Sequence, residues 1–165
     1  DWYLSKSLNI YDMKDPPTIW KQVADKDGFI NSNYGWCIFS LENGKQYMNC
    51  LNKLKTNKDS RRAMMIYTRP TMFSDFNANG MSDFICTNSV QVMIRKDKLI
   101  YIVNQRSCDA VYGFKNDMYW HRYVFNRLLK DLSEVYPNLG KIGIIHQVGS
   151  LHVYEKHFKF LLNMI

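Results

Sequence analysis

Cys86 is the residue of this sequence with the greatest potential for chemistry. It stands in the stretch DFICTNSVQ, between an apolar pair and a run of small polar residues. Free cysteine is among the most buried residue types, so a packed core thiol is the default interpretation. A nucleophilic thiolate would instead need a lowered pKa, which nearby arginine cations would supply. The stretch alone leaves both interpretations open.

Two groups of basic residues are candidates for holding a phosphate. Arg106 and Ser107, in NQRSCD, would present a bidentate cation and a hydroxyl at a strand end, or they are a surface arginine and a turn serine. Arg61 and Arg62, in DSRR, would point to opposite faces of a strand and so seldom serve one local pocket. That doublet is therefore either a solvated edge or a phosphate contact made across a subunit interface.

Three more polar residues stand where a ligand could be bound. Asp117 opens the longest helical pattern, and capping that helix would by itself account for an aspartate there. His152 and Tyr154, in GSLHVY, are two residues apart and would point to one side of a strand. They either hold a sugar hydroxyl or form a satisfied core pair.

The composition narrows the class of partner. The chain has 165 residues, enough for a single domain, and carries a formal charge of +7 with a pI near 9.2. A basic excess favours anionic partners. The arginines lie between apolar, strand-like segments and not in one basic helix or tail, which suits a phosphate pocket better than a duplex and makes a nucleic-acid partner the weaker alternative.

The cysteine pattern and the hydropathy exclude several other classes. The four cysteines are widely spaced, without a C-x-x-C pair or a His-x-x-x-His spacing, so no metal site is expected. No apolar run approaches the ~20 residues of a membrane span, and no signal-peptide pattern opens the chain. We therefore expect reduced thiols in a cytoplasm, the host's if the protein is viral, and no membrane partner.

The elements that would position these residues follow from periodicity and turn signals, and they indicate an α+β fold with a mostly antiparallel or mixed sheet. Helices are expected at 19–24 (capped by Thr18), 41–55, 116–136 (Tyr119, Tyr123, Leu128 and Leu132 near one face) and 155–165. Strands are expected at 61–70 and 141–154, with a β-hairpin of 84–95 and 99–107 turning at 96–98, and residues 72–83 as a loop.

The order and spacing of these signals resemble the thymidylate synthase superfamily, and within it the phage-type deoxycytidylate (dCMP) hydroxymethylases. The similar stretches span nearly the whole chain: PPTIWKQVADKDGFINSNYGW, DSRRAMMIYTRP, GMSDFICTNSVQ, NQRSCDAVYGFKND and VGSLHVYEKHF. Cys86 and Arg106 are 20 residues apart, the separation expected in this superfamily. The resemblance implies one domain over residues 1–165, a thymidylate-synthase-like mixed sheet packed against helices, and a homodimer formed sheet to sheet.

The resemblance also implies a role for each candidate. Cys86 would add as a thiolate to C6 of the pyrimidine, and Tyr34 and Trp20 would shape the catalytic and folate cavity. Asp109 would lie on the base and folate side. The remaining contacts to the nucleotide would be these: Arg106 and Ser107 to the 5′-phosphate, Arg61 and Arg62 to that phosphate from the second subunit, and His152 and Tyr154 to the 3′-hydroxyl.

Asp117 distinguishes the two candidate bases within this resemblance. Thymidylate synthases carry Asn at the matching position, where its amide pairs with uracil, whereas a carboxyl can accept from cytosine N4 and, when protonated, donate to N3. The synthases also follow their cysteine with His, and here Thr87 follows Cys86. We therefore expect dCMP as substrate.

The implied reaction transfers a one-carbon unit from 5,10-methylenetetrahydrofolate, without a metal, and ends in water addition to give 5-hydroxymethyl-dCMP and tetrahydrofolate. The alternatives are a thymidylate synthase or dUMP hydroxymethylase and, in another class, a non-catalytic basic nucleic-acid-binding protein. The superfamily's catalytic glutamate would lie just before the segment beginning DWY, and its C-terminal segment beyond Ile165. The sequence is therefore expected to be incomplete at both ends, and this part alone is expected to lack much of the chemistry.

Overall fold

Four strands of the described residues form one mixed sheet. The computed structural model describes residues 2–163 and orders these strands β1-β2-β3-β4. They are β1 (Met64–Ile66), β2 (Thr87–Arg95), β3 (Lys98–Asp109) and β4 (Gly140–His152). β1 pairs with β2 and β2 with β3 in antiparallel fashion, whereas β3 and β4 are parallel. The expected α+β class with a mixed sheet is confirmed.

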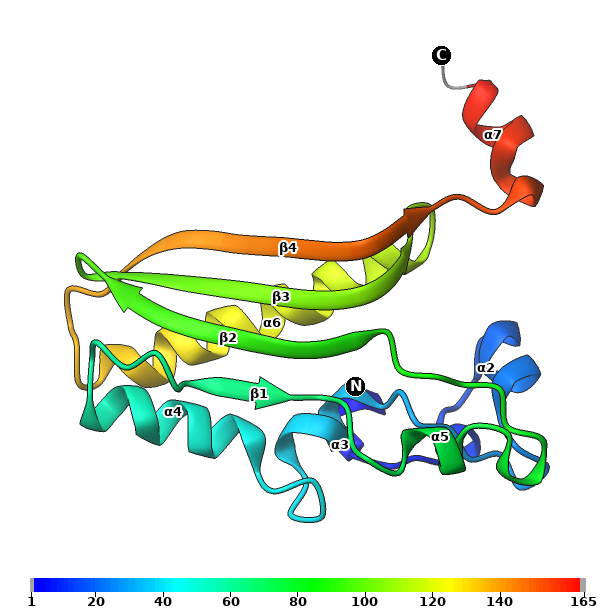
Figure 1. Ribbon diagram of the computed structural model, residues 1–165, viewed down its shortest axis with the longest axis horizontal. Coiled ribbons are helices and arrows are strands. Elements are labelled where there is room, and N and C mark those ends of the chain that lie inside the picture. The colour runs from blue at the N-terminus through cyan, green and yellow to red at the C-terminus, as the bar shows by residue number, and fades with distance from the viewer. Residues whose placement is uncertain (1, 164–165) are drawn as a thin grey trace.

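The helices are distributed unevenly around this sheet (Figure 1). The longer ones, α4 (Gln46–Thr56) and α6 (Gly113–Ser133), contact the strands, and α7 (Phe158–Leu162) projects beyond the end of β4. The short elements are α1 (Trp2–Ser5), η1 (Ile10–Asp12), α2 (Thr18–Val23), α3 (Tyr34–Phe39), α5 (Met72–Asp75), η2 (Ala78–Gly80) and η3 (Glu155–His157). Within residues 2–163, no helix has the length and apolar character needed to cross a membrane.

The β2–β3 hairpin forms where the sequence predicts it. Lys96 and Asp97 have φ angles of 50° and 55°, the left-handed conformations that a two-residue turn needs to match the twist of its strands. Arg95 therefore pairs with Lys98 directly across the turn. From this point the register runs back to the pairing of Thr87 with Gln105, which brings the chain around Cys86 beside Arg106.

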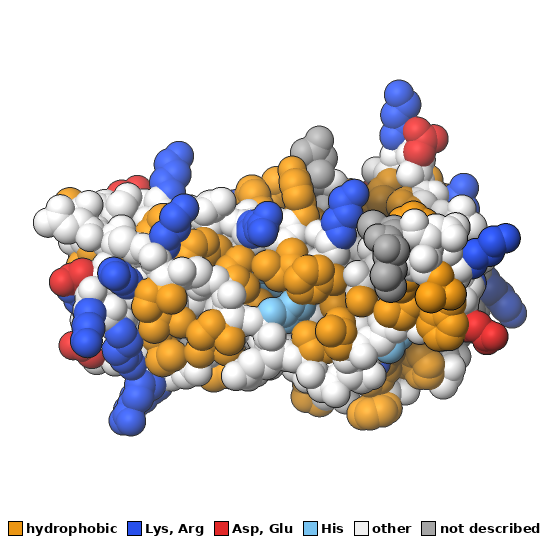
Figure 2. All heavy atoms as spheres, turned by 90° about the horizontal axis from the view of Figure 1, so that it is seen from above, with side chains coloured by type: hydrophobic (Ala, Val, Ile, Leu, Met, Phe, Trp, Pro, Cys, Tyr) orange, Lys and Arg blue, Asp and Glu red, His pale blue; other side chains and the backbone are white. Residues whose placement is uncertain are grey.

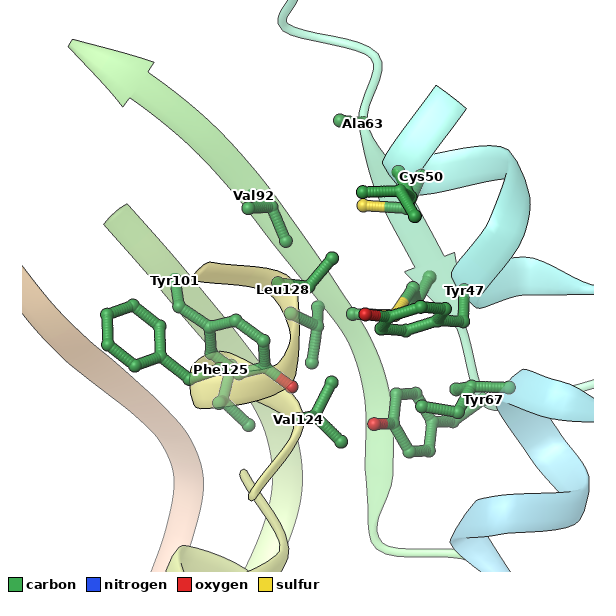
Figure 3. Packing of buried hydrophobic residues seen from close by; sticks show 14 of the residues in the cluster. Tyr47, Cys50, Ala63, Tyr67, Val92, Tyr101, Val124, Phe125 and Leu128 are labelled. Carbon is green, nitrogen blue, oxygen red and sulfur yellow. The ribbon is translucent and has the colours of Figure 1, made fainter. Parts of the chain in front are cut away.

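The core lies between the sheet and the two longer helices (Figure 3). Alternate residues of β2 and β3, such as Val92 and Tyr101, point to this side, as the period of two in a strand requires. α4 adds Tyr47, and α6 adds Val124 and Leu128. The opposite face of the sheet carries exposed or half-exposed apolar side chains in this chain: Met64, Ile66, Met93, Ile100, Ile102 and Ile145.

Several element boundaries differ from the sequence predictions. Thr18 is the first residue of α2 and Pro17 precedes it, so Thr18 does not cap the helix. α4 begins at Gln46 and not near Leu41, because residues 41–44 form a turn and Lys45 adopts a left-handed conformation. β1 is limited to three residues, and the predicted loop at 72–83 contains α5 and η2.

The long helix also differs from its prediction at its start and in its buried face. α6 begins at Gly113, so Asp117 lies inside the helix and the predicted capping role is wrong. The prediction that Tyr119 lies on the buried face of the helix is wrong, since its side chain is 81% exposed. Trp120 and His121, the next two residues of α6, face the core instead. The final helical segment is divided into η3 and α7, with residues 164–165 outside the described range.

Asp83 joins the loop before α3 to the segment that leads into β2. Its Oδ2 accepts from the backbone N–H groups of Asn31 and Ser32 at 2.8 and 2.7 Å, and its Oδ1 accepts from the Ser32 hydroxyl at 2.8 Å. Burial raises the pKa of Asp83, and these donors oppose that rise. A buried carboxyl with three donors thus connects Tyr34 and Cys86, each of which lies within three residues of these contacts.

We expect Asp83→Ala to destabilise the fold by roughly 2–4 kcal/mol, because three buried donors lose their acceptor. Asp83→Asn keeps the shape and one oxygen acceptor, so its loss is expected to be smaller. Urea unfolding followed by circular dichroism measures both. Asp59→Ala, at an exposed aspartate, is the matched control; equal free energies of unfolding for Asp83→Ala and the control would contradict this role.

Candidate active site

Arg106 holds the segment around Cys86 against the end of β3. Its Nε–H donates to the Ile85 carbonyl at 2.9 Å, and its Nη2 donates to the Phe84 carbonyl at 2.6 Å. The same Nη2 lies 3.7 Å from Cys86 Sγ, and the guanidinium is 4.9 Å from the centre of the Phe84 ring. The expected proximity of a cation to this thiol is therefore present, although Arg106 remains exposed.

Cys86 differs from the other cysteines in its accessibility. All four cysteines are among the described residues; Cys37, Cys50 and Cys108 are buried, and Cys86 is half-buried. Burial raises the pKa of Cys86, the Arg106 cation opposes this rise, and the carboxyls of Asp117 and Asp83 add to it. The lowered pKa expected of a nucleophile is not found, because partial burial and two carboxyls outweigh one exposed cation.

Asp117 turns from α6 toward β3 and into a partly buried environment. Gln105 Nε2–H donates to its Oδ2 at 2.5 Å, and Cys108 Sγ is 4.0 Å from the same oxygen. Burial raises the pKa of Asp117 to about 6, while hydrogen bonds from Gln105 and Tyr34 limit the rise. A carboxyl with this pKa is partly protonated near neutral pH, whereas an ordinary exposed aspartate is almost fully ionised there.

Tyr34 and Thr87 form the floor beside these groups. Both are almost fully buried, and the Thr87 hydroxyl donates to the Tyr34 oxygen at 3.1 Å. Thr87, the residue that follows Cys86, thus holds Tyr34 in place. Asn33 caps α3 by accepting from the Trp36 N–H at 2.9 Å, which fixes the start of the helix that carries Tyr34. Burial, with Asp117 next in effect, raises the pKa of Tyr34 well above its usual value.

Asp109 holds the turn into α6. Its Oδ1 accepts from the Val111 N–H at 3.1 Å, and its Oδ2 accepts from Tyr112 and Gly113 at 3.0 and 3.3 Å. Burial alone would raise the pKa of Asp109, but these donors lower it below its usual range. The capping function that the sequence suggested for Asp117 therefore belongs to the aspartate eight residues earlier.

The parallel pairing of β3 and β4 places the remaining nucleotide candidates near Arg106. Ser107 is opposite Ser150, Asp109 is opposite His152, and the Ala110 N–H donates to the His152 carbonyl at 2.8 Å. β4 ends at His152, so Tyr154 lies beyond the strand, yet the two rings still meet edge to face at 5.0 Å. His152 and Tyr154 are partly exposed or exposed and not a core pair.

Arg61 and Arg62 do not join this site within one chain. Both are exposed, and Met64, two residues later, pairs with Gln91. Gln91 is five residues along the chain from Cys86, so the doublet lies at least roughly 17 Å along the sheet from the thiol, at about 3.3 Å per residue. The structure thus favours the solvated or intersubunit interpretations over a contact within the chain.

Trp20 lies in α2, half-buried, with its ring 6.0 Å from that of Trp2. A hollow of about 530 Å³ lies beside Trp2 and extends to Asp12 and Pro17. Neither this hollow nor a second one of about 330 Å³ near Arg69 includes Cys86, Arg106 or Asp117 in its lining. These two hollows therefore lie apart from the candidate site. Among the described residues, no cluster of three or more His, Cys, Asp or Glu could hold a metal ion.

Two residues of the site were not identified from the sequence. Gln105 contacts Asp117, and Asp83 anchors the segment before Cys86. Gln105 stands beside Arg106 in NQRSCD and alternates with it on β3, so its burial opposite Arg106 could have been expected from the strand period. Asp83 carries no comparable signal, because its partners lie about fifty residues earlier.

We expect Cys86 to be the first cysteine alkylated by iodoacetamide, with a rate that rises with pH as the thiolate forms. Arg106→Gln removes the opposing cation, so the pKa of the Cys86 thiol should rise further and the alkylation rate at fixed pH should fall severalfold. Mass spectrometry of the labelled protein measures this. Arg95→Gln, at the far end of β2, is the control; equal rates in the two variants would show that Arg106 does not act on the thiol.

Comparisons with known proteins identify the family of the chain. The thymidylate synthase family model matches residues 1–165. Deoxycytidylate 5-hydroxymethyltransferases of Enterobacteria phages T6 and T4 are 53% and 52% identical to the chain, with 96% of the chain aligned in each case. The chain spans 65% of the length of these relatives.

A solved structure gives independent support for the fold. The thermostable thymidylate synthase A of Bacillus subtilis superposes with a TM-score of 0.65 at 27% sequence identity, covering 98% of this chain and 57% of the other. The resemblance inferred from the motifs is thereby confirmed. Because the family model matches from the first residue to the last, the chain belongs to the thymidylate synthase family.

Proposed function

We propose that this chain forms the nucleotide site of a dCMP hydroxymethyltransferase, which transfers a one-carbon unit to C5 of dCMP. The observation that carries the proposal is the grouping of Cys86, Arg106 and the partly buried Asp117 around one end of β2 and β3. The similarity to phage deoxycytidylate 5-hydroxymethyltransferases supports the same substrate class.

Arg106 and Ser107 bind the 5′-phosphate in this proposal. Two carbonyls hold the guanidinium in place, so its charge is oriented before the nucleotide arrives and little side-chain entropy is lost on binding. His152 and Tyr154 contact the 3′-hydroxyl from the neighbouring end of β4. The phosphate anchor thus sits beside the thiol that must reach the ring.

Asp117 selects the base. With a pKa near 6, its carboxyl can be protonated at modest free-energy cost near neutral pH, donate to cytosine N3 and accept from the N4 amino group. Uracil presents an N3–H donor and an O4 acceptor, which this pattern does not match. A hydrogen bond to N3 also draws electron density from the ring and so favours attack at C6.

Cys86 provides covalent catalysis. Its sulfur bonds to C6, the electron pair of the C5–C6 bond moves toward N3, and C5 becomes nucleophilic enough to accept the one-carbon unit. Loss of a proton from C5 and release of tetrahydrofolate, the carrier of the one-carbon unit, would leave an exocyclic methylene on the ring. Water adds to this carbon, and the sulfur leaves C6 with its electron pair, giving 5-hydroxymethyl-dCMP. Burial raises the pKa of Cys86, so the resting group is mainly the thiol and its proton must leave as the sulfur bonds to C6.

5,10-methylenetetrahydrofolate would supply the one-carbon unit at the oxidation level of formaldehyde. Trp20 offers an aromatic surface beside Trp2 and the adjoining hollow, which fits a flat heterocycle. Asp109 keeps both oxygens on backbone donors, so it would act on the folate side mainly by fixing the turn into α6 and thereby Asp117. Tyr34 is buried, is held by the Thr87 hydroxyl and bonds to Asp117, so it would exclude water from the base.

The proposed dimer pairs the uncovered sheet faces of two chains. This face carries apolar side chains on β1, β2, β3 and β4 that no helix within residues 2–163 covers. Figure 2 shows hydrophobic groups beside Lys and Arg side chains on the β4 side of the molecule. An isologous contact would carry Arg61 and Arg62 toward the partner's phosphate site. Their distance from Cys86 in their own chain supports this arrangement.

The full-length protein is expected to convert dCMP to 5-hydroxymethyl-dCMP when incubated with tetrahydrofolate and formaldehyde, and to release tetrahydrofolate unoxidised. Chromatography with mass spectrometry identifies the nucleotide product. Cys86→Ser should lower turnover by at least about a thousandfold, since it removes the nucleophile. Conversion of dUMP with no reaction of dCMP would refute the proposed substrate.

Asp117→Asn should reverse the base preference. The amide has no acid proton to share with cytosine N3, so kcat/KM for dCMP is expected to fall by roughly a hundredfold or more. The amide can accept from uracil N3–H and donate to O4, so kcat/KM for dUMP is expected to rise. Competition between the two nucleotides in one reaction measures the ratio directly. Asn116→Asp, at the exposed neighbouring position on α6, tests for a general effect of charge. An unchanged ratio in Asp117→Asn would exclude Asp117 as the base-selecting residue.

A further inference from the structure

A partly buried hydrogen-bond chain runs from Asp117 through Gln105 to a histidine on β4. Gln105 Nε2 lies 2.5 Å from Asp117 Oδ2, and Gln105 Oε1 lies 2.5 Å from His146 Nε2. Phe114 stacks on the His146 ring at 5.7 Å between centroids. Gln105 is 3% exposed, and the three residues come from α6, β3 and β4.

This chain can be polarised in two ways. In the first, His146 Nε2–H donates to the Gln105 carbonyl, and the Gln105 amide donates to Asp117 Oδ2. In the second, the Gln105 amide is turned over, so it donates to a bare His146 Nε2 while a protonated Asp117 Oδ2 donates to Gln105. Only these two arrangements avoid placing two acceptors or two donors face to face.

The surroundings of His146 separate the two arrangements. Its Nδ1 is buried without a hydrogen-bond partner. In the second arrangement Nδ1 must carry the proton, which leaves a buried N–H unsatisfied, whereas in the first it is a bare nitrogen and loses less. Burial lowers the pKa of His146, so near neutral pH the ring is mainly neutral and holds a single proton. The first arrangement is therefore favoured.

We propose that His146 is a positioning residue for Asp117: through Gln105 it keeps Oδ2 of Asp117 as a hydrogen-bond acceptor and so confines the acid proton to Oδ1. An aspartic acid with its proton on a defined oxygen presents one donor and one acceptor in a fixed order, which cytosine requires at N3 and N4. The role in base selection rests on the proposed function, while the polarity of the hydrogen-bond chain does not.

Other titratable groups face this chain and must be accounted for in any measurement of it. Around Asp117 they are Tyr34 of α3, Cys108 of β3 and Cys86 before β2. His121 of α6 faces the His146 ring at 6.1 Å between centroids, and burial lowers its pKa to about 3. His121 is thus neutral throughout the range in which Asp117 titrates, and Tyr34 and Cys108 have raised pKa values above it.

The test uses the full-length protein with two matched substitutions. His146→Phe keeps a ring against Phe114 but removes the donor, and His146→Gln keeps an N–H donor at a similar reach. ¹⁵N-histidine NMR of the wild-type protein at pH 5 and pH 8 reports the His146 tautomer, and loss of its signals in His146→Phe assigns them. ¹³C-carboxyl NMR gives the titration midpoint of Asp117 in each protein.

We expect His146 to keep the proton on Nε2 at both pH values, and to be the neutral Nε2–H tautomer at pH 8. His146→Phe frees the Gln105 amide to turn over, so the Asp117 midpoint should rise by roughly one unit because the carboxylate loses a donor. His146→Gln should keep the wild-type midpoint. Turnover of dCMP should fall severalfold in His146→Phe, mainly in kcat/KM, and be restored in His146→Gln.

Two results would overturn the inference: a change of His146 to the Nδ1–H tautomer as Asp117 protonates, or an Asp117 midpoint in folded His146→Phe equal to that of the wild type. Both are independent of activity. If the wild-type protein fails to convert dCMP while the tautomer and midpoints behave as expected, the proposed function fails and the positioning role of His146 stands.

Discussion

The candidate site depends on the hydrogen bonds that the Arg106 guanidinium makes to the backbone before Cys86. The Arg106 side chain reaches from β3 to the carbonyls of Phe84 and Ile85 and thereby fixes the backbone on which Cys86 is carried, while its charge stays beside the sulfur. A guanidinium can do this because its N–H donors form a rigid planar fork, which one ammonium group cannot reproduce. The residue that anchors the phosphate in our proposal is also the residue that builds the nucleophile's segment.

Burial, and not the number of nearby charges, dominates the electrostatics of the site. Cys86 lies against a cation, yet its pKa is raised, and Asp117 accepts hydrogen bonds, yet its pKa rises to about 6. The two groups are thus held neutral or partly neutral until a ligand changes their surroundings. In our proposal this suits Asp117, since a carboxyl that can take up a proton near neutral pH can donate to cytosine.

Polar groups distant in sequence hold the reactive ones in place. Asp83 connects the loop before α3 to the segment before β2. Thr87 of β2 donates a hydrogen bond to Tyr34 of α3 and so joins the same two regions. On the other side, Gln105 and His146 support Asp117. Buried hydrogen bonds of this kind are costly to leave unpaired, so each one restricts its neighbours to a single arrangement.

The sequence by itself determined the α+β class, the β2–β3 hairpin with its turn at Lys96 and Asp97, and the family, because these follow from local periodicity, turn chemistry and motif spacing. It misplaced the helix cap, since Asp109 and Asp117 are equally good caps in isolation and only the turn geometry separates them. Tertiary structure alone decided the burial of Asp117, the anchoring by Asp83 and the pairing of Gln105 with His146. These depend on the parallel register of β3 with β4 and on contacts between segments about forty or more residues apart, which no local pattern encodes.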